Sequence, residues 1–297
     1  MSATAQKNTQ YRRPQGHAAL VFFLLLGVMP LAAGLVYALL YSLGLIGYLN
    51  TGFTLQYWYI ALTSKALWAS LTLSLGLAVL VSAVSFFLAL RCVIALRPHL
   101  KQRGVRFSLH LPLALPPLVA AFVSFQWLGG TGMLARGAHA IGLIQTTDSF
   151  PVLVNDPYYI GVFVTLLLLN FPFILLLVLD QYDRAGIPEY VHLAATLGGN
   201  SAQIRRKVIQ AILVHRVLPT LVLYTVFLFG AFEVPLLLGQ QSPAMISVLI
   251  SQKFSKFNLA DVPVAYTGAV LYAGVILVLI ACFWRWHFRQ SPNTEPA

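Results

Sequence analysis

Side chains that can carry out acid–base or nucleophilic chemistry are sparse in this sequence. Its 297 residues contain only 8 Asp and Glu, 7 His and 2 Cys. None of these residues has the spacing of a metal site, and Cys92 and Cys282 are expected to be free thiols. The sequence also lacks the Gly-x-x-x-x-Gly-Lys-Ser/Thr loop that binds nucleotide phosphates. We therefore expect no catalytic residue, no metal and no cofactor on this chain.

Glu233 is the acidic residue that lies inside a long apolar stretch. A carboxylate within a membrane helix usually faces a pathway or a partner, where Glu233 would favour a cationic solute or pair with a basic group. The alternative is that Glu233 lies close enough to the surface to be hydrated. Phe229 falls about 40° from Glu233 on a helix and is a candidate pathway neighbour, whereas Tyr224 falls about 180° away. Asn170 is a further polar candidate, either for the pathway or for a hydrogen bond to a neighbouring helix.

A second informative group of residues lies at 187–207, between two apolar stretches. Pro188 and Glu189 suit the first turn of a helix, because the missing proline N–H costs nothing there and the carboxylate meets the positive end of the helix dipole. Gly198-Gly199-Asn200 is expected to end that helix, and Ser201 is the expected N-cap of the next. The segment therefore predicts a short helix, a glycine turn and a second helix.

The same segment carries small side chains that would let the surface of another protein come close. They are Ala194, Ala195, Gly198 and Gly199. A simple connecting loop with a glycine turn is the alternative interpretation. His192 and His215 flank this region and are expected to face solvent, and His110 is expected to be a hydrated residue at a membrane surface.

The composition identifies the elements that must position these residues. The chain is 59% hydrophobic and only 9% charged, whereas a soluble domain carries about a quarter charged residues. So few charges cannot cover a water-exposed surface, and each membrane span needs roughly 20 apolar residues. We predict six transmembrane helices, at Ala18 to Leu43, Leu67 to Leu90, Phe107 to Leu128, Tyr159 to Leu179, Val217 to Leu238 and Val264 to Trp284.

The distribution of Lys and Arg predicts the orientation of these spans. Fifteen of the 19 fall before the first span, after the second, between the fourth and fifth or after the sixth, and four fall on the other side. Because cytoplasmic loops carry the excess of Lys and Arg, both termini are expected in the cytoplasm. The chain then divides into a tail at 1–16, one membrane domain at 17–288 and a tail at 289–297. The short basic clusters between apolar runs argue against nucleic-acid binding despite the net charge of +11.

The loops and prolines add two expectations. The outer segments Gly129 to Tyr158 and Gly239 to Pro263 could each fold as a short helix at the outer surface. Prolines in the third and fifth spans would each free a backbone carbonyl and allow bending, or would simply mark breaks in helix packing. They are Pro112, Pro116, Pro117, Pro219 and Pro235.

The segment at 187–207 resembles the cytoplasmic coupling motif of ABC importer permeases, in which Glu-Ala-Ala is followed after three residues by Gly. Ala194, Ala195 and Gly199 match that spacing, with Leu193 in place of the Glu, and Ile187-Pro188 fits the Ile-Pro common just before the motif. A second register places His192 at the Glu position and matches only Ala194 and Gly198. The Leu-Pro that usually follows the Gly falls on Ala211-Ile212.

Three other stretches are similar to the same family, in the same order. They are Phe53-Thr-Leu-Gln-Tyr57 before the second span, the proline-bearing run Leu111 to Ala121, and Gly230-Ala-Phe-Glu-Val-Pro-Leu-Leu-Leu-Gly239. The set is most similar to permeases of the spermidine/putrescine, iron, sulfate and thiamine type. The resemblance implies an all-α integral membrane protein with the type I ABC importer permease fold and a cytoplasmic coupling helix between its fourth and fifth spans.

The resemblance also implies partners and a location in the bacterial cytoplasmic membrane. These are a second permease subunit, identical or different, a cytoplasmic ABC ATPase dimer that supplies ATP and Mg²⁺, and an extracytoplasmic substrate-binding protein. The residues implied to contact the ATPase are Pro188, Glu189, His192, Leu193, Ala194, Ala195, Gly198, Gly199, Asn200 and Ser201. The substrate would be a small solute such as a polyamine, a metal ion or another small polar nutrient. A secondary transporter driven by an ion gradient is the alternative, although the spans hold few carboxylates and no inverted repeat.

Overall fold

The described part of the chain, residues 16–47, 52–146, 149–255 and 258–290 of a computed structural model, contains helices and no strands. The long helices are α4 (Lys65–Leu100), α8 (Ile160–Arg184), α11 (Ala211–Phe229) and α14 (Asp261–Gln290). The shorter helices are α1 (Gly16–Phe23), α2 (Met29–Ser42), α3 (Gln56–Thr63), α5 (Arg103–His110), α6 (Pro117–Leu128), α7 (Met133–Ala140), α9 (Ile187–Thr196), α10 (Ser201–Gln203), α12 (Glu233–Leu238) and α13 (Ile246–Phe254). Two π-helical stretches, Leu24–Val28 and Ile204–Gln210, join α1 to α2 and α10 to α11.

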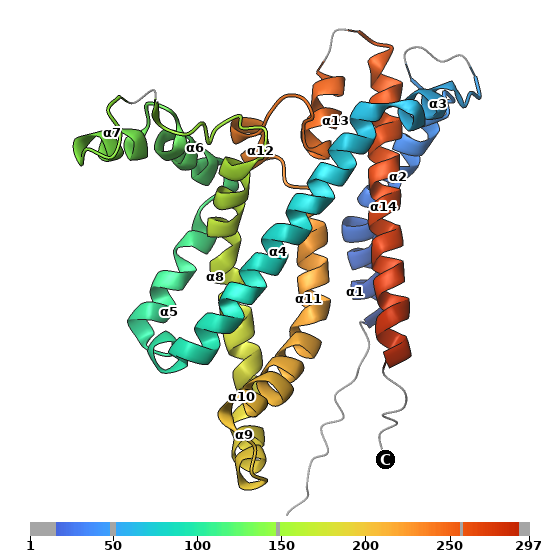
Figure 1. The fold of residues 1–297 in the computed structure, drawn as a ribbon. Coiled ribbons are helices and arrows are strands. Elements are labelled where there is room, and N and C mark those ends of the chain that lie inside the picture. The colour runs from blue at the N-terminus through green and yellow to red at the C-terminus, as the bar shows by residue number, and fades with distance from the viewer. Residues whose placement is uncertain (1–15, 48–51, 147–148, 256–257, 291–297) are drawn as a thin grey trace, which may run out of the picture.

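The bundle is centred on α4, which packs along α8 and against α11, while α14 packs against α2 and α13 (Figure 1). The short helices α3, α12 and α13 lie at one end of the bundle, together with α6 and α7. Helices α9 and α10 project from the opposite end (Figure 1). We call these the α13 end and the α9 end.

Small residues on α4 allow close packing against its neighbouring helices. Ser70, Ser74, Ser85 and Ala89 are all fully buried on one face of α4. Small side chains let the backbones of membrane helices come close, which is how such helices associate without a hydrophobic driving force. Two buried apolar clusters continue this contact, one toward the α13 end around Leu67 and one toward the α9 end.

Six helical stretches in the described residues are long and apolar enough to cross a membrane. They are Leu20–Ser42, Lys65–Leu100, Pro117–Ala140, Ile160–Arg184, Ser201–Phe229 and Asp261–Trp286. The number of candidate spans therefore agrees with the predicted six. The first, second, fourth and sixth lie where the sequence predicts them, and the second, fourth and sixth extend beyond the predicted apolar limits.

The third predicted span, Phe107 to Leu128, is wrong as a single helix. Helix α5 ends at His110, a 3-10 turn covers Pro112–Ala114, and α6 begins at Pro117. Proline has no N–H and disfavours helix for the residue before it, so three prolines within six residues interrupt the helix. Helices α6 and α7 then turn sideways from the α13 end of the bundle (Figure 1).

The fifth predicted span, Val217 to Leu238, is also wrong at both ends. The helical stretch begins earlier, at Ser201, and α11 ends at Phe229. A non-helical link at 230–232 separates α11 from α12, in which Pro235 is the third residue. Of the prolines predicted to bend spans, Pro219 lies inside a continuous helix, and the other four lie at or near helix starts.

The short helices predicted within Gly129 to Tyr158 and Gly239 to Pro263 are present as α7 and α13, and their location at the outer surface stays a prediction. The basic segments that follow α4 and α8 lie at the α9 end, where the described chain also ends (Figure 1). One end of the bundle therefore gathers the predicted cytoplasmic clusters, and assigning that end to the cytoplasm stays a prediction. The tails at 1–15 and 291–297 and Lys256 lie outside the described residues.

Candidate functional site

A pocket of about 210 Å³ opens beside the break between α11 and α12. Three polar side chains contribute to its lining, Asn170 from α8, Tyr224 from α11 and Glu233 from α12. The remaining lining is apolar, from Pro112, Leu113, Leu115, Pro117, Leu166, Leu169, Phe227, Leu228, Ala231 and Val234. We call this the α11–α12 pocket. It is a largely apolar pocket with a few polar groups, which is the usual form of a small-molecule site.

Asn170 is held in place by two hydrogen bonds. Its amide nitrogen donates to the Leu166 carbonyl, and its side-chain oxygen accepts from the Tyr224 hydroxyl. The Tyr224 ring stacks on Phe173, with 4.8 Å between ring centroids. The predicted hydrogen bond from Asn170 to a neighbouring helix is thus confirmed, and the same pair also borders the pocket.

Glu233 lies in the first turn of α12 and is partly exposed. The N–H groups of a first helical turn favour a carboxylate there. Among the described residues the Glu233 carboxylate takes part in no ion pair. It therefore contributes a negative charge at the edge of the pocket that is available to a solute or to another subunit.

The predicted shared helical face of Phe229 and Glu233 is wrong, because the helix breaks between them. Phe229 is fully buried and packs on Tyr272, with ring centroids 4.8 Å apart. At Gly230 a Cβ atom would lie 2.5 Å from the Tyr272 hydroxyl, so a larger residue there would have to displace the Tyr272 side chain. Tyr224, which an unbroken helix would place opposite Glu233, lines the pocket with it instead.

The second candidate site is the helix pair at the α9 end. Helix α9 follows Gly186, whose φ of +62° suits glycine, and its first residue, Ile187, is fully buried. At its far end Gly198 has φ +82°, and the Gly199 N–H donates to the Ala194 carbonyl at 3.0 Å. A Cβ atom on Gly199 would lie only 2.8 Å from that carbonyl oxygen.

The next helix is capped by Asn200 rather than by Ser201 as predicted. The Asn200 side-chain oxygen accepts from the Gln203 N–H at 2.8 Å, and the Gln203 side-chain oxygen accepts from the Asn200 N–H at 3.3 Å. This reciprocal pair is a capping box, and it moves the helix start one residue earlier. Ser201 is the first helical residue, and the basic residues Arg205, Arg206 and Lys207 follow in the π-helical stretch.

Helix α9 presents large apolar side chains to the outside. Tyr190 is 51% exposed, Leu193 is 59% exposed, and Leu197 directly after the helix is 80% exposed. The spacing of three and four residues places them on one side of the helix. The sequence analysis missed this surface, although the same spacing is visible in the sequence.

The remaining predicted residues lie close to their expected surroundings. His110, His192 and His215 are exposed, and His110 Nδ1 lies 2.7 Å from the Arg106 carbonyl oxygen. Cys92 and Cys282 are free thiols. Within the described residues no group of three or more His, Cys, Asp or Glu side chains gathers into a metal site.

Solved structures share this architecture. One is a bacterial ABC transporter involved in the import of the acidic polysaccharide alginate, with TM-score 0.66 and 17% identity over 93% of this chain and 94% of that chain. Another is the bacterial alginate ABC transporter in complex with an alginate pentasaccharide-bound periplasmic protein, with TM-score 0.64 and 18% identity over 89% and 90%. No protein-family model and no curated protein matches the sequence. The chain therefore has the fold of these transporter chains over nearly its whole length.

Proposed function

We propose that this chain is the transmembrane permease subunit of an ATP-driven ABC importer. The observation that carries the proposal is the common fold with alginate ABC transporter chains, which covers about nine tenths or more of both chains. The type I permease fold and the pairing with a second permease, identical or different, are part of this proposal. The common fold favours the importer over a secondary transporter driven by an ion gradient.

Helix α9 is the proposed contact with the ATPase. It projects from the end of the bundle that carries the basic segments (Figure 1). Its exposed Tyr190, Leu193 and Leu197 form an apolar surface, which in a projecting helix is typical of a protein contact. The proposed contact residues are Pro188, Glu189, His192, Leu193, Ala194, Ala195, Gly198, Gly199, Asn200 and Ser201.

The glycine turn supports this role because it limits how the two helices can move. The Gly199 hydrogen bond to Ala194 fixes the turn at the end of α9, and the capping box of Asn200 fixes the start of α10 directly after it. A force applied to α9 would then move α10 and α11 with it as a unit. ATP and Mg²⁺ would bind the separate ATPase, and this chain would hold no cofactor.

The α11–α12 pocket is the proposed part of the substrate pathway on this chain. Glu233 supplies a carboxylate, and the Asn170–Tyr224 pair supplies neutral polar groups. A small cation, such as a polyamine or a metal ion, or another small polar nutrient fits this chemistry. Alginate is the ligand of the similar transporter and is not carried over to this chain.

A binding protein outside the cell and a place in the bacterial cytoplasmic membrane complete the proposal. The similar alginate transporter was solved with a periplasmic protein, which supports a binding-protein partner here. The exposed apolar side chains of α1, α2, α6 and α7 suit lipid or a second permease subunit.

The source of energy tests the proposed function directly. Right-side-out vesicles that contain this chain and its natural partners are loaded with ATP, and uptake of radiolabelled spermidine, putrescine and ferric ion is measured. Uptake should require internal ATP and survive ionophores that dissipate the proton and sodium gradients. Uptake that proceeds without ATP and stops with the ionophores would show that the secondary transporter is the correct alternative.

A further inference from the structure

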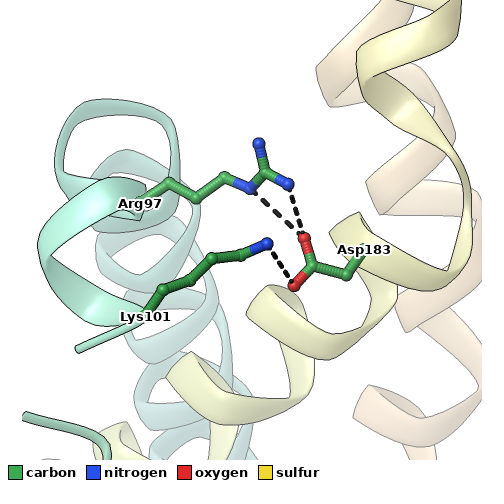
Figure 2. Close-up of polar contacts among 3 residues, drawn as sticks. All are labelled: Arg97, Lys101 and Asp183. Atoms are coloured by element: carbon green, nitrogen blue, oxygen red, sulfur yellow. Dashed lines mark hydrogen bonds and ion pairs between the residues drawn. The ribbon is translucent and has the colours of Figure 1, made fainter. Parts of the chain in front are cut away.

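Two cations from the end of α4 bind one carboxylate at the end of α8. Arg97 donates to Asp183 Oδ1 from Nη2 at 2.7 Å and from Nε at 3.2 Å, and Lys101 Nζ lies 3.0 Å from Oδ2 (Figure 2). The Arg97 guanidinium also lies over the Tyr182 ring, 4.4 Å from its centroid. We call Arg97, Lys101 and Asp183 the clamp.

The clamp differs from an ordinary surface ion pair in what it joins. Asp180 and Arg184 form a pair at 2.8 Å, but both lie on α8, four residues apart, so that pair links no separate elements. In the clamp, Arg97 contacts one oxygen of Asp183 and Lys101 contacts the other, and these two cations lie four residues apart at the end of another helix. A network of several charges holds a more defined position than an isolated surface ion pair.

The clamp lies at the joint between α8 and α9. Asp183 is in the last turn of α8, Gly186 turns the chain, and α9 begins at Ile187. Ile187 and Ala185 are buried in one apolar cluster with Leu100 of α4. The clamp therefore joins the end of α4 to the last turn of α8, four residues before α9 begins, and a buried apolar cluster contains both Leu100 at the end of α4 and Ile187 at the start of α9.

The other end of α4 is fastened at the α13 end of the bundle. The buried Ser74 hydroxyl accepts a hydrogen bond at 2.8 Å from the N–H of Ile246, the first residue of α13. With 36 residues α4 is the longest helix in the described chain. It runs from the region of α3 and α13 to the region of α5 and α9 (Figure 1). Along the same continuous helix, Leu71 and Val81 of α4 lie in one buried cluster with Leu166, Leu228 and Val234, which line the α11–α12 pocket. A displacement at the clamp can thus reach the pocket through α4.

We propose that Asp183 is a positioning residue, through which the clamp transmits displacement of α9 to α4 and so to the α11–α12 pocket. The inference rests on the proposed function, because α9 is displaced only if an ATPase acts on it. Loss of the clamp would leave the ATPase bound to α9 and active. The ATP-dependent movement at the pocket would be lost or reduced.

The test uses the complex purified through a tag on this chain, with whatever subunits co-purify. A reporter cysteine replaces Phe227, which is exposed at the pocket, in a background with Cys92→Ser and Cys282→Ser. The measured quantity is the rate of maleimide labelling with and without ATP and orthovanadate. With the clamp intact, we expect the labelling rate with ATP and vanadate to differ about fivefold or more from the rate without them, which is the range for coupled sites in general.

The variants distinguish a loss of transmitted movement from a loss of binding between this chain and the ATPase. Asp183→Asn should reduce the ATP-dependent change in labelling to less than about twofold, against the fivefold expected of coupled sites, while the amount of ATPase subunit and its hydrolysis rate stay near the reference. Asp183→Glu, which keeps the negative charge between Arg97 and Lys101, should restore the change. Asp180→Asn is the matched control on the same helix and should behave like the reference.

Two results would overturn the clamp proposal. One is an Asp183→Asn complex that keeps the full ATP-dependent change in labelling. The other is an Asp183→Asn chain that no longer co-purifies with the ATPase, which would make the clamp an assembly contact. Failure of the reference chain to co-purify with any ATPase would instead contradict the proposed function itself.

Discussion

At the scale of single residues, the α11–α12 pocket combines one free carboxylate with one satisfied polar pair. Glu233 lies at the start of α12 with no ion pair among the described residues, whereas Asn170 and Tyr224 bond to each other. These different states predict different effects of substitution. The carboxylate should affect the transported solute, and the pair should affect the packing of α8 on α11.

Replacing Glu233 with Gln removes the charge and keeps the size. If the solute is a cation, its KM for uptake should rise about tenfold, which corresponds to about 1.4 kcal/mol of lost attraction. The measurement is spermidine uptake into ATP-loaded vesicles, with Asp180→Asn as a control carboxylate at the other end of the bundle. An unchanged KM, in vesicles that take up spermidine, would show that Glu233 does not contact the solute.

Breaking the Asn170–Tyr224 pair should lower the thermal stability of the purified chain. Tyr224→Phe leaves the buried Asn170 oxygen without its donor, at a cost of about 1–2 kcal/mol. The double variant Asn170→Leu with Tyr224→Phe should cost less than the sum of the two single variants, because the pair is removed as a unit. Additive effects in a thermal-unfolding assay of all four chains would contradict the hydrogen bond.

The sequence identified Asn170 and Glu233 from their polarity alone, because polar groups in apolar stretches are rare enough to stand out. It assigned the wrong neighbour to Glu233, since helical angles apply only to an unbroken helix. Gly230 directly follows the end of α11 and lies against the Tyr272 hydroxyl of α14, which is a tertiary contact. The sequence around Gly230 gives no sign that Tyr272, more than 40 residues later in the chain, lies against it.

At the scale of elements, the glycine turn between α9 and α10 is the most constrained connection. Gly199→Val would place side-chain atoms against the Ala194 carbonyl, so the turn must open and the direction of α9 must change. In this variant we expect the ATPase to continue to hydrolyse ATP, while less of that hydrolysis drives uptake. Uptake per ATP hydrolysed should fall about tenfold, equivalent to about 1.4 kcal/mol of lost coupling.

The control for this prediction is Gly104→Ala. Gly104 lies in α5, and a Cβ atom there meets nothing within 4 Å, so the substitution should leave coupling unchanged. Equal ratios of uptake to hydrolysis in Gly199→Val and Gly104→Ala would contradict the role of the turn.

Sequence patterns predicted the helix, glycine turn and second helix at 187–207 because Gly, Pro and capping residues act locally. The breaks in the third and fifth spans were predicted less well. Prolines at 112, 116 and 117 signal a break, but the sideways course of α6 depends on its packing against α8 and α12. The clamp was missed because Arg97 and Lys101 were interpreted only as orientation signals, and their partner lies more than 80 residues away in the chain.

At the scale of the whole molecule, the chain is a helical bundle with a different task at each end. The α13 end carries the pocket and the sideways helices, and the α9 end carries a projecting apolar helix among basic residues (Figure 1). Composition predicted a membrane protein, and the apolar stretches together with the alternation of Lys and Arg clusters predicted six spans. We propose that ATP is hydrolysed by a separate subunit that binds the exposed side of α9.

Purification of the complex tests that assignment most directly. The tagged chain is extracted from its native membrane in mild detergent, and the co-purifying subunits are identified by mass spectrometry. We predict that an ATPase subunit with a Gly-x-x-x-x-Gly-Lys-Ser/Thr loop co-purifies with the reference chain. This subunit should be lost when Leu193 and Leu197 are both replaced by Asp. A stable, transport-active preparation that contains no ATPase would contradict the account.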